Sequence, residues 1–179
     1  MSARGLTYIA ISTALLAVSA WIAFPLGEGY VTMQTAIICL IAALLGAKRS
    51  VFAVVAYILL GAIGAPVFAG FTGGIAKLLA PTGGYIVGFI PLACVVGVAA
   101  DVTKNLTRGR WLFLIFSIVL GTFLCYALGT AWFALTEGAS LGIWAAVTIC
   151  VLPYLPFDIA KIFLTVYLVK KLRKFIKTE

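Results

Sequence analysis

The sequence predicts an all-α membrane protein, a single domain of residues 1–179 built from six transmembrane helices. Two observations lead to this class. The chain is 64% hydrophobic and only 10% charged, and its mean hydropathy of +1.21 is far above that of a soluble domain. Its apolar runs approach the length of about twenty residues that a helix needs to cross a bilayer, and polar or glycine-rich segments separate them.

These runs and their interruptions define the expected helices. In order, they cover residues 6–24, 34–46, 51–64, 84–100, 111–135 and 156–175. Pro25 ends the first helix, and the polar residues 47–50 turn the chain between the second and third. The apolar segment 141–152 is too short to cross a membrane alone. Pro156 should begin the last helix, because proline fits the first turn of a helix.

The first run has two interpretations. Residues 18–20 (Val-Ser-Ala) would suit the cleavage site of a signal peptide. On the interpretation that we prefer, the run is a permanent span. Ala10, Ala14 and Ala17 then lie on one helical face, and small residues at this spacing let a helix of a partner protein approach closely. Ordinary packing inside the protein would explain the same stripe.

Residues 66–89 stand out because they are rich in glycine within an apolar chain. Glycines at positions 70, 73, 74, 83, 84 and 88 accompany two prolines and a lysine, so the segment cannot be helical throughout. Irregular backbone at membrane depth is tolerated only where protein or a cavity shields it from lipid. The segment therefore predicts a ligand-binding loop between the third and fourth helices.

The net charge of +8 is explained by topology. If alternate loops lie on the side of the N-terminus, that side receives Arg4, Lys48, Arg49, Lys104, Arg108, Arg110, Lys170, Lys171, Arg173, Lys174 and Lys177. The opposite side receives Lys77, Glu28 and Glu137. Because short basic loops stay in the cytoplasm, we expect both termini there and the basic C-terminal tail against anionic membrane lipid. No nucleic-acid partner is needed to explain the charge.

Asp158 and Lys161 are the two ionisable residues expected inside a span. Each would cost about 2.5 to 3.5 kcal/mol at the centre of a membrane helix, so such residues usually serve a function. Their spacing of three puts them on one helical face. A cation near a helix N-terminus opposes the helix dipole, so an anion is expected beside Lys161. It is either Asp158 alone, in a structural pair, or the carboxylate of a ligand.

Further candidate binding groups fall on the same, outer side of this topology. They are Gln34, Gly73, Gly74, Lys77, Thr82, Gly83, Gly84 and Tyr85. Thr82 is a candidate N-cap that would leave free N–H groups at the start of the fourth helix, where anions bind. With Tyr30 and Tyr154 as further aromatic walls, the site would suit a small amphipathic molecule with one carboxylate.

Several signals of enzymes are missing from the sequence. The glycine-rich segment contains no G-x-x-x-x-G-K-[ST] motif, so it is not an ATP site. The chain has no histidine, and no serine or cysteine is paired with a suitable base. The four cysteines lie far apart in apolar runs and are expected to pack as small apolar side chains. We therefore expect no catalytic residue, no metal site and no cofactor.

Five segments resemble the BioY family, the biotin-binding S components of energy-coupling-factor (ECF) transporters. They are VTMQT at 31–35, LLGAK at 44–48, YILLGAIGAPVFAG at 57–70, PTGGYIVGF at 81–89 and PYLPFDIAK at 153–161. The resemblance implies capture of biotin at the outer face of the plasma membrane of a prokaryote. It also implies a membrane coupling protein and two ATPase subunits as partners, with the alanine stripe as the docking face for the coupling protein.

Two positions depart from the family's pattern. Phe157 replaces a glycine before the aspartate, and residues 75–77 (Ile-Ala-Lys) replace a run that is usually glycine-rich. Both are expected to touch the pocket, where they would alter the ligand preference. Three rival interpretations remain: a membrane enzyme with Asp158 as its base, a self-sufficient carrier or channel acting as a homo-oligomer, and an S component for another vitamin.

Overall fold

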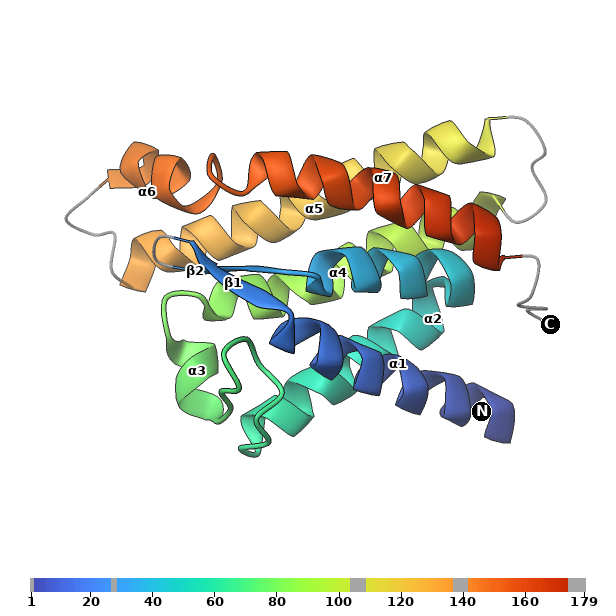
Figure 1. Ribbon diagram of the computed structural model, residues 1–179, viewed down its shortest axis with the longest axis horizontal. Helices are drawn as coiled ribbons and strands as arrows, with labels where there is room; N and C mark the ends of the chain where they lie inside the picture. Colours follow the sequence, from blue (N-terminus) through green and yellow to red (C-terminus); the bar gives the residue numbers. More distant parts are fainter. Residues whose placement is uncertain (1, 27–28, 104–108, 137–141, 174–179) are drawn as a thin grey trace.

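The computed structural model describes residues 2–26, 29–103, 109–136 and 142–173. It is mostly helical, as expected, with one small hairpin (Figure 1). The elements in chain order are α1 (Ala3–Trp21), β1 (Ala23–Leu26), β2 (Gly29–Thr32), α2 (Gln34–Ala62), α3 (Ile75–Leu79), α4 (Gly83–Val102), α5 (Arg110–Thr136), α6 (Gly142–Cys150) and α7 (Leu155–Leu172). Four of them, α1, α2, α4 and α5, are long and apolar enough to cross a membrane.

Helix α2 reverses direction at Gly46. Its first half leads away from the hairpin and its second half returns beside α1 (Figure 1). Gly46 has φ +79° and ψ 176°, a conformation that glycine adopts without the steric penalty of a side chain. The prediction that residues 47–50 form the turn was wrong, because one glycine breaks the helix and these four residues are already helical.

The predicted first helix is too long by three residues at its C-terminal end. It ends at Trp21, and Phe24 belongs to strand β1, which pairs antiparallel with β2 from Ala23 opposite Thr32 to Leu26 opposite Gly29. Two strands of four residues are too short to show clear alternation of polar and apolar residues. Pro25 lies within β1, where proline is tolerated because the strand is at the edge of its sheet.

The glycine-rich segment is irregular over its first part only. Residues 63–74, which we call the loop after α2, contain glycines with φ of +104°, +72° and +95° at positions 64, 70 and 74. The short helix α3 and the start of α4 at Gly83 follow. The segment thus combines a loop, one turn of helix and the first turns of a long helix.

The core lies between α1, α2, α4, α5 and α7. Leu16, Ile38, Leu92, Ile118 and Val169, one from each helix, are at most 1% exposed. Glycine permits close helix contacts here: a Cβ added at Gly97 of α4 would lie 2.4 Å from the Cα of Ala47. Small residues at such crossings are characteristic of membrane helices.

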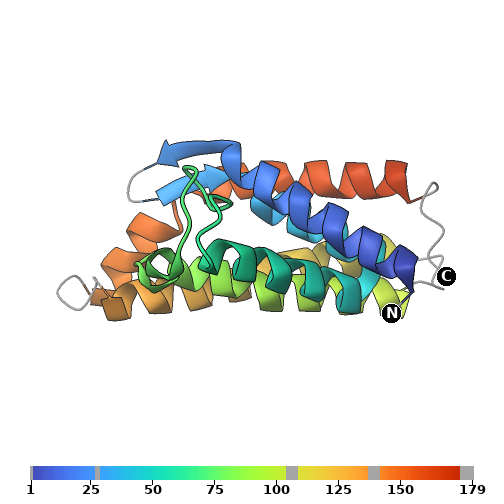
Figure 2. The ribbon, with the colours of Figure 1, turned by 90° about the horizontal axis from the view of Figure 1, so that it is seen from below.

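The start of α1 and the end of α7 lie at the same end of the molecule, away from the hairpin and α3 (Figures 1 and 2). Three of the described helices have basic residues at this end: Arg4 at the start of α1, Arg110 at the start of α5, and Lys170 and Lys171 in the last turn of α7. The Lys170 ammonium lies 5.1 Å from the centre of the Trp111 ring. The predicted topology also gave a side of the membrane to six residues that lie outside the described part of the chain: Glu28, Lys104, Arg108, Glu137, Lys174 and Lys177.

Candidate functional site

The hairpin, α3 and α6 surround one end of a cavity of about 150 Å³. Side chains from α2, α4, α5 and α7 form its walls, and these walls are mainly apolar or aromatic. At about 30 Å³ for each water molecule in the liquid, this volume corresponds to roughly five waters or to a small organic group. The candidate residues lie on the wall of this cavity or close to it.

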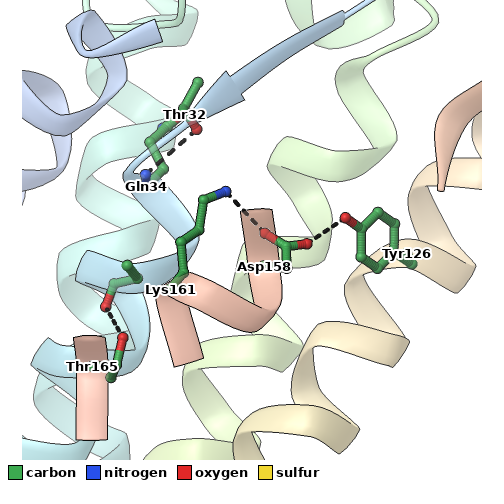
Figure 3. A network of polar contacts seen from close by, with 7 residues as sticks. Thr32, Gln34, Tyr126, Asp158, Lys161 and Thr165 are labelled. Carbon is green, nitrogen blue, oxygen red and sulfur yellow. Dashed lines mark hydrogen bonds and ion pairs between the residues drawn. The ribbon is translucent and has the colours of Figure 1, made fainter. Parts of the chain in front are cut away.

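Asp158 and Lys161 lie on the wall of this cavity, in the first turns of α7. The Lys161 ammonium donates to Asp158 Oδ1 at 2.9 Å, and the two side chains are 12% and 9% exposed. The hydroxyl of Tyr126, on α5, donates to the other carboxylate oxygen, Oδ2 (Figure 3). The expected pair is therefore present, and both carboxylate oxygens have a donor.

Gln34 also lines the cavity, but its side chain is bound within the protein. Its amide Nε2 donates to the hydroxyl of Tyr57 at 2.7 Å, and its Oε1 accepts from Thr32 at 3.2 Å. Tyr57 in turn donates to the carbonyl of Val67 at 3.1 Å. Gln34 thus connects the start of α2 to the loop after α2, a role that the sequence did not indicate.

The start of α4 differs from the prediction. Thr82 lines the cavity and stands at the N-cap position, but its side chain makes no capping hydrogen bond. The N–H groups of Gly83 and Tyr85 donate to the carbonyls of Ala80 and Thr82, so neither is free for an anion. Tyr85 contributes its ring to the wall, and its hydroxyl lies 3.1 Å from Thr130 Oγ1.

The glycines of the predicted site are structural. Gly73, Gly74, Gly83 and Gly84 do not line the cavity. A Cβ at Gly84 would lie 2.2 Å from Cβ of Trp132, so this glycine permits α4 to pack against α5. The glycine-rich pattern therefore marks the close packing and turns around the site, whereas larger side chains form its surface.

The two positions that depart from the family's pattern have different environments. Lys77, on α3, lines the cavity. Phe157 is 48% exposed on the outside of α7 and does not line it, so the expectation that Phe157 touches the pocket was wrong. On a helix, its neighbour Asp158 points about 100° away, which is why one of the two faces the cavity and the other does not.

Two segments cover the cavity, the β1–β2 hairpin and the loop after α2. The hydroxyl of Tyr154 donates to the carbonyl of Leu26 in the hairpin at 2.6 Å. The indole of Trp21, at the end of α1, stacks on Phe71 at 5.2 Å between centroids and donates to the Pro66 carbonyl at 3.0 Å. Figure 2 shows the loop rising beside the hairpin. We call these two segments the covers.

The sequence did not identify several wall residues. Thr35, Tyr57, Phe68, Phe89, Thr122, Tyr126 and Phe133 all line the cavity. Aromatic and hydroxyl side chains on an apolar helix look like ordinary packing, so only a contact with a charged residue, as Tyr126 makes with Asp158, would distinguish them. A second cavity of about 10 Å³, enough for one water, adjoins Thr35, Thr122, Asp158 and Lys161.

These features define a class of protein: an integral membrane protein, mostly helical, whose covered pocket for a small molecule contains a buried ion pair. Residues 1–178 match the sequence model of the BioY family. The chain belongs to that family, as its motifs predicted.

Individual relatives extend over almost the whole chain. The biotin transporter BioY of Thermotoga maritima is 39% identical over 96% of this chain and 96% of its own length. The probable biotin transporter BioY of Pyrococcus horikoshii is 34% identical over 97% of this chain and 98% of its own. A crystal structure of the S-component for biotin from an ECF-type ABC transporter is 27% identical, with a TM-score of 0.87 over 97% of this chain and 95% of that one.

Proposed function

We propose that this protein captures biotin as the S component of an ATP-driven ECF transporter and delivers it inward together with partner subunits. The observation that carries the proposal is the buried Asp158–Lys161 pair on the wall of an otherwise apolar cavity. Buried charges in a membrane helix are expensive and are usually kept for a function. The family of the chain and the printed names of its relatives support biotin as the ligand.

The chemistry of the cavity agrees with such a ligand. The bicyclic skeleton of biotin fuses a polar ureido ring to an apolar tetrahydrothiophene ring, which carries an acid tail. The skeleton would lie against aromatic walls such as Tyr85, Phe89 and Phe133, while Asp158, Lys161 and Lys77 supply the charged and hydrogen-bonding groups. Small-molecule sites commonly combine an apolar lining with a few polar groups that fix the ligand's orientation. Thr82, which also lines the cavity, completes our candidate binding residues.

The proposal includes the topology. The spans are α1, the two halves of α2 on either side of Gly46, α4, α5 and α7, which makes six in one substrate-binding domain of residues 1–179. The end of the molecule that carries Arg4, Arg110 and Lys170 then lies in the cytoplasm, because basic residues favour that side of a plasma membrane. The cavity opens at the outer face, and both termini are cytoplasmic.

The proposed partners are a membrane coupling protein and two ATPase subunits, which would supply the ATP hydrolysis that this chain has no motif for. Ala10 and Ala14 are exposed on α1, and Ala17 is half-buried against the core. An exposed patch of small residues allows a second helix to approach closely. This surface is our candidate for contact with the coupling protein.

Two measurements test the proposed function. Mass spectrometry of protein purified in detergent should detect biotin as the co-purifying small molecule. Calorimetry on ligand-free protein should show that Asp158→Asn and Lys161→Ala each weaken biotin binding by at least tenfold, because hydrogen bonds to charged groups contribute about 1.5 to 3 kcal/mol. Unchanged affinity in both variants, with the fold retained by thermal melting, would contradict the proposal.

A reconstitution experiment tests the need for partners. Proteoliposomes with this chain alone should bind biotin without accumulating it, whereas addition of the coupling protein, the ATPase subunits and ATP should produce uptake. Uptake by the chain alone would instead favour a self-sufficient carrier. Crosslinking in the same vesicles would show whether that activity belongs to a homo-oligomer.

A further inference from the structure

The hydroxyl of Thr35 is buried, and it has no hydrogen-bond partner within the described part of the chain. Other helical threonines donate to the carbonyl four residues earlier, as Thr13 does to Ile9 and Thr103 to Ala99. Thr35 is only the second residue of α2, so no helical turn precedes it to offer such a carbonyl. A buried hydroxyl without a partner is unfavourable by about 1 to 3 kcal/mol.

Thr35 lines both the main cavity and the small second cavity, and so do Asp158 and Lys161. These three residues therefore meet where the two cavities adjoin, a place that we call the floor. The Lys161 ammonium has three donors, one of which is used on Asp158. The carboxylate has accepted one hydrogen bond on each oxygen and retains lone pairs for more.

The charges of the floor favour a neutral polar group over an anion. Asp158 and Lys161 neutralise one another at 2.9 Å, so a ligand carboxylate placed here would lie beside a carboxylate of the protein. A cyclic urea offers one carbonyl acceptor and two N–H donors. These match a lysine that donates, an aspartate that accepts and a threonine that can do either.

The other cation of the cavity wall is Lys77, on α3. Among the described residues, no acidic side chain lies within ion-pair distance of it. Figure 1 shows α3 and the start of α7 on opposite sides of this end of the molecule. A ligand with a neutral head at the floor and an acid tail would thus find a separate cation for its tail, one that has no acidic partner in the described part of the chain.

We propose that Thr35 is a ligand-binding residue, and that the floor of Thr35, Asp158 and Lys161 binds the ureido ring of biotin while Lys77 faces its carboxylate. This inference rests on the proposed function and adds to it a binding residue and an orientation of the ligand. It replaces Gln34, whose side chain is already bound within the protein, by the residue next to it.

The first test compares two substitutions at one position. Thr35→Val keeps the shape but removes the hydroxyl, and Thr35→Ser keeps the hydroxyl. We expect calorimetry to give about three- to tenfold weaker biotin binding for Thr35→Val and less than a twofold change for Thr35→Ser. Thr13→Val is the control, because its buried hydroxyl lies on α1, away from the cavity, and should leave the affinity unchanged.

Two ligand analogues then test the orientation. With biotin amide, which lacks the carboxylate, Thr35→Val should still bind more weakly than the wild type, and Lys77→Ala should have no effect. With the tetrahydrothiophene valeric acid that lacks the ureido ring, Thr35→Val should bind as the wild type does, and Lys77→Ala should bind more weakly. The reverse pattern would overturn the orientation.

The outcomes separate this inference from the proposed function. If Asp158→Asn weakens biotin binding and Thr35→Val does not, the function stands and Thr35 is not a ligand-binding residue, its hydroxyl holding only a water in the second cavity. If the wild-type protein does not bind biotin, the proposed function itself fails. A loss of affinity in Thr35→Val that Thr35→Ser restores supports the inference.

Discussion

The Asp101 carboxylate, in the last turn of α4, accepts a hydrogen bond from the N–H of Ala47 at 2.9 Å. Ala47 is the first residue after the break at Gly46, so this N–H belongs to the start of the second half of α2 and has no carbonyl of its own helix to bind. An acidic side chain at a helix start also interacts favourably with the helix dipole. Asp101 thus caps a helix from a different element.

We expect Asp101→Ala to lower the stability by about 1 to 2 kcal/mol, the usual effect of losing a helix cap. Asp101→Asn should have a smaller effect, because the amide keeps an oxygen that can accept the bond but loses the charge. Thermal unfolding in detergent measures both. A melting temperature of Asp101→Ala equal to that of the wild type would show that the cap is not important for stability.

Gly46→Ala should destabilise the fold more than Gly64→Ala. Both glycines have positive φ, +79° and +104°, so alanine is strained at either position. A Cβ at Gly46 would also lie 2.2 Å from Asp101 Oδ1, whereas nothing lies within 4 Å of one at Gly64. The difference between the two melting temperatures therefore reports on the contact with Asp101, and equal values would contradict it.

Tyr126→Phe should weaken biotin binding by about tenfold, or about 1.4 kcal/mol, because Asp158 loses one of its two donors. The carboxylate would then be free to turn within the cavity. Calorimetry gives the affinity. Tyr167→Phe is the matched control, since Tyr167 is 60% exposed on the same helix as Asp158 and should have no effect. Equal affinities for the two variants would show that Tyr126 does not position Asp158.

Ala14→Trp should prevent assembly with the coupling protein and leave biotin binding intact. The side chain is exposed on α1 and points away from the cavity, so an indole there blocks a partner helix without reaching the ligand. Co-purification with the coupling protein and calorimetry measure the two properties. Val119→Trp, at a half-exposed position on α5, is the control, and normal assembly of Ala14→Trp would reject this docking face.

Substitutions of Trp21 should accelerate ligand release in a graded manner. Trp21→Phe keeps the stacking on Phe71 but loses the hydrogen bond to Pro66, and Trp21→Ala loses both. Dissociation of labelled biotin in a chase experiment should be fastest for Trp21→Ala and intermediate for Trp21→Phe. Phe24→Ala, which removes an exposed aromatic ring of the hairpin, should release biotin at the wild-type rate. Identical rates for all the variants would exclude a role of the loop in retention.

The features that the sequence predicted were those with a strong local signal. Long apolar runs indicated the helices, and the spacing of Asp158 and Lys161 indicated a pair on one helical face. The family likeness, carried by motifs of several residues, is confirmed by the match over residues 1–178.

Most of the features that the sequence did not predict depend on contacts between distant segments. The turn at Gly46 is completed by Asp101, which binds the N–H of Ala47 from fifty-four positions later in the chain. The hydrogen bonds of Gln34 depend on Tyr57, and those of Asp158 on Tyr126, and neither tyrosine stands out in its own helix. The N–H groups of Gly83 and Tyr85, expected to be free, donate to the carbonyls of Ala80 and Thr82 instead, which is a local detail of the backbone that residue types do not encode.

Helix α1 is joined to both covers of the cavity. Trp21 holds the loop after α2, and β1 of the hairpin begins at Ala23, two residues further on. The same helix exposes Ala10 and Ala14, which precede Trp21 by eleven and seven residues. A protein that displaces α1 therefore acts on the covers without touching the ligand. If docking changes the affinity for the vitamin by some factor, thermodynamic reciprocity requires that the vitamin change the affinity for the docking protein by the same factor.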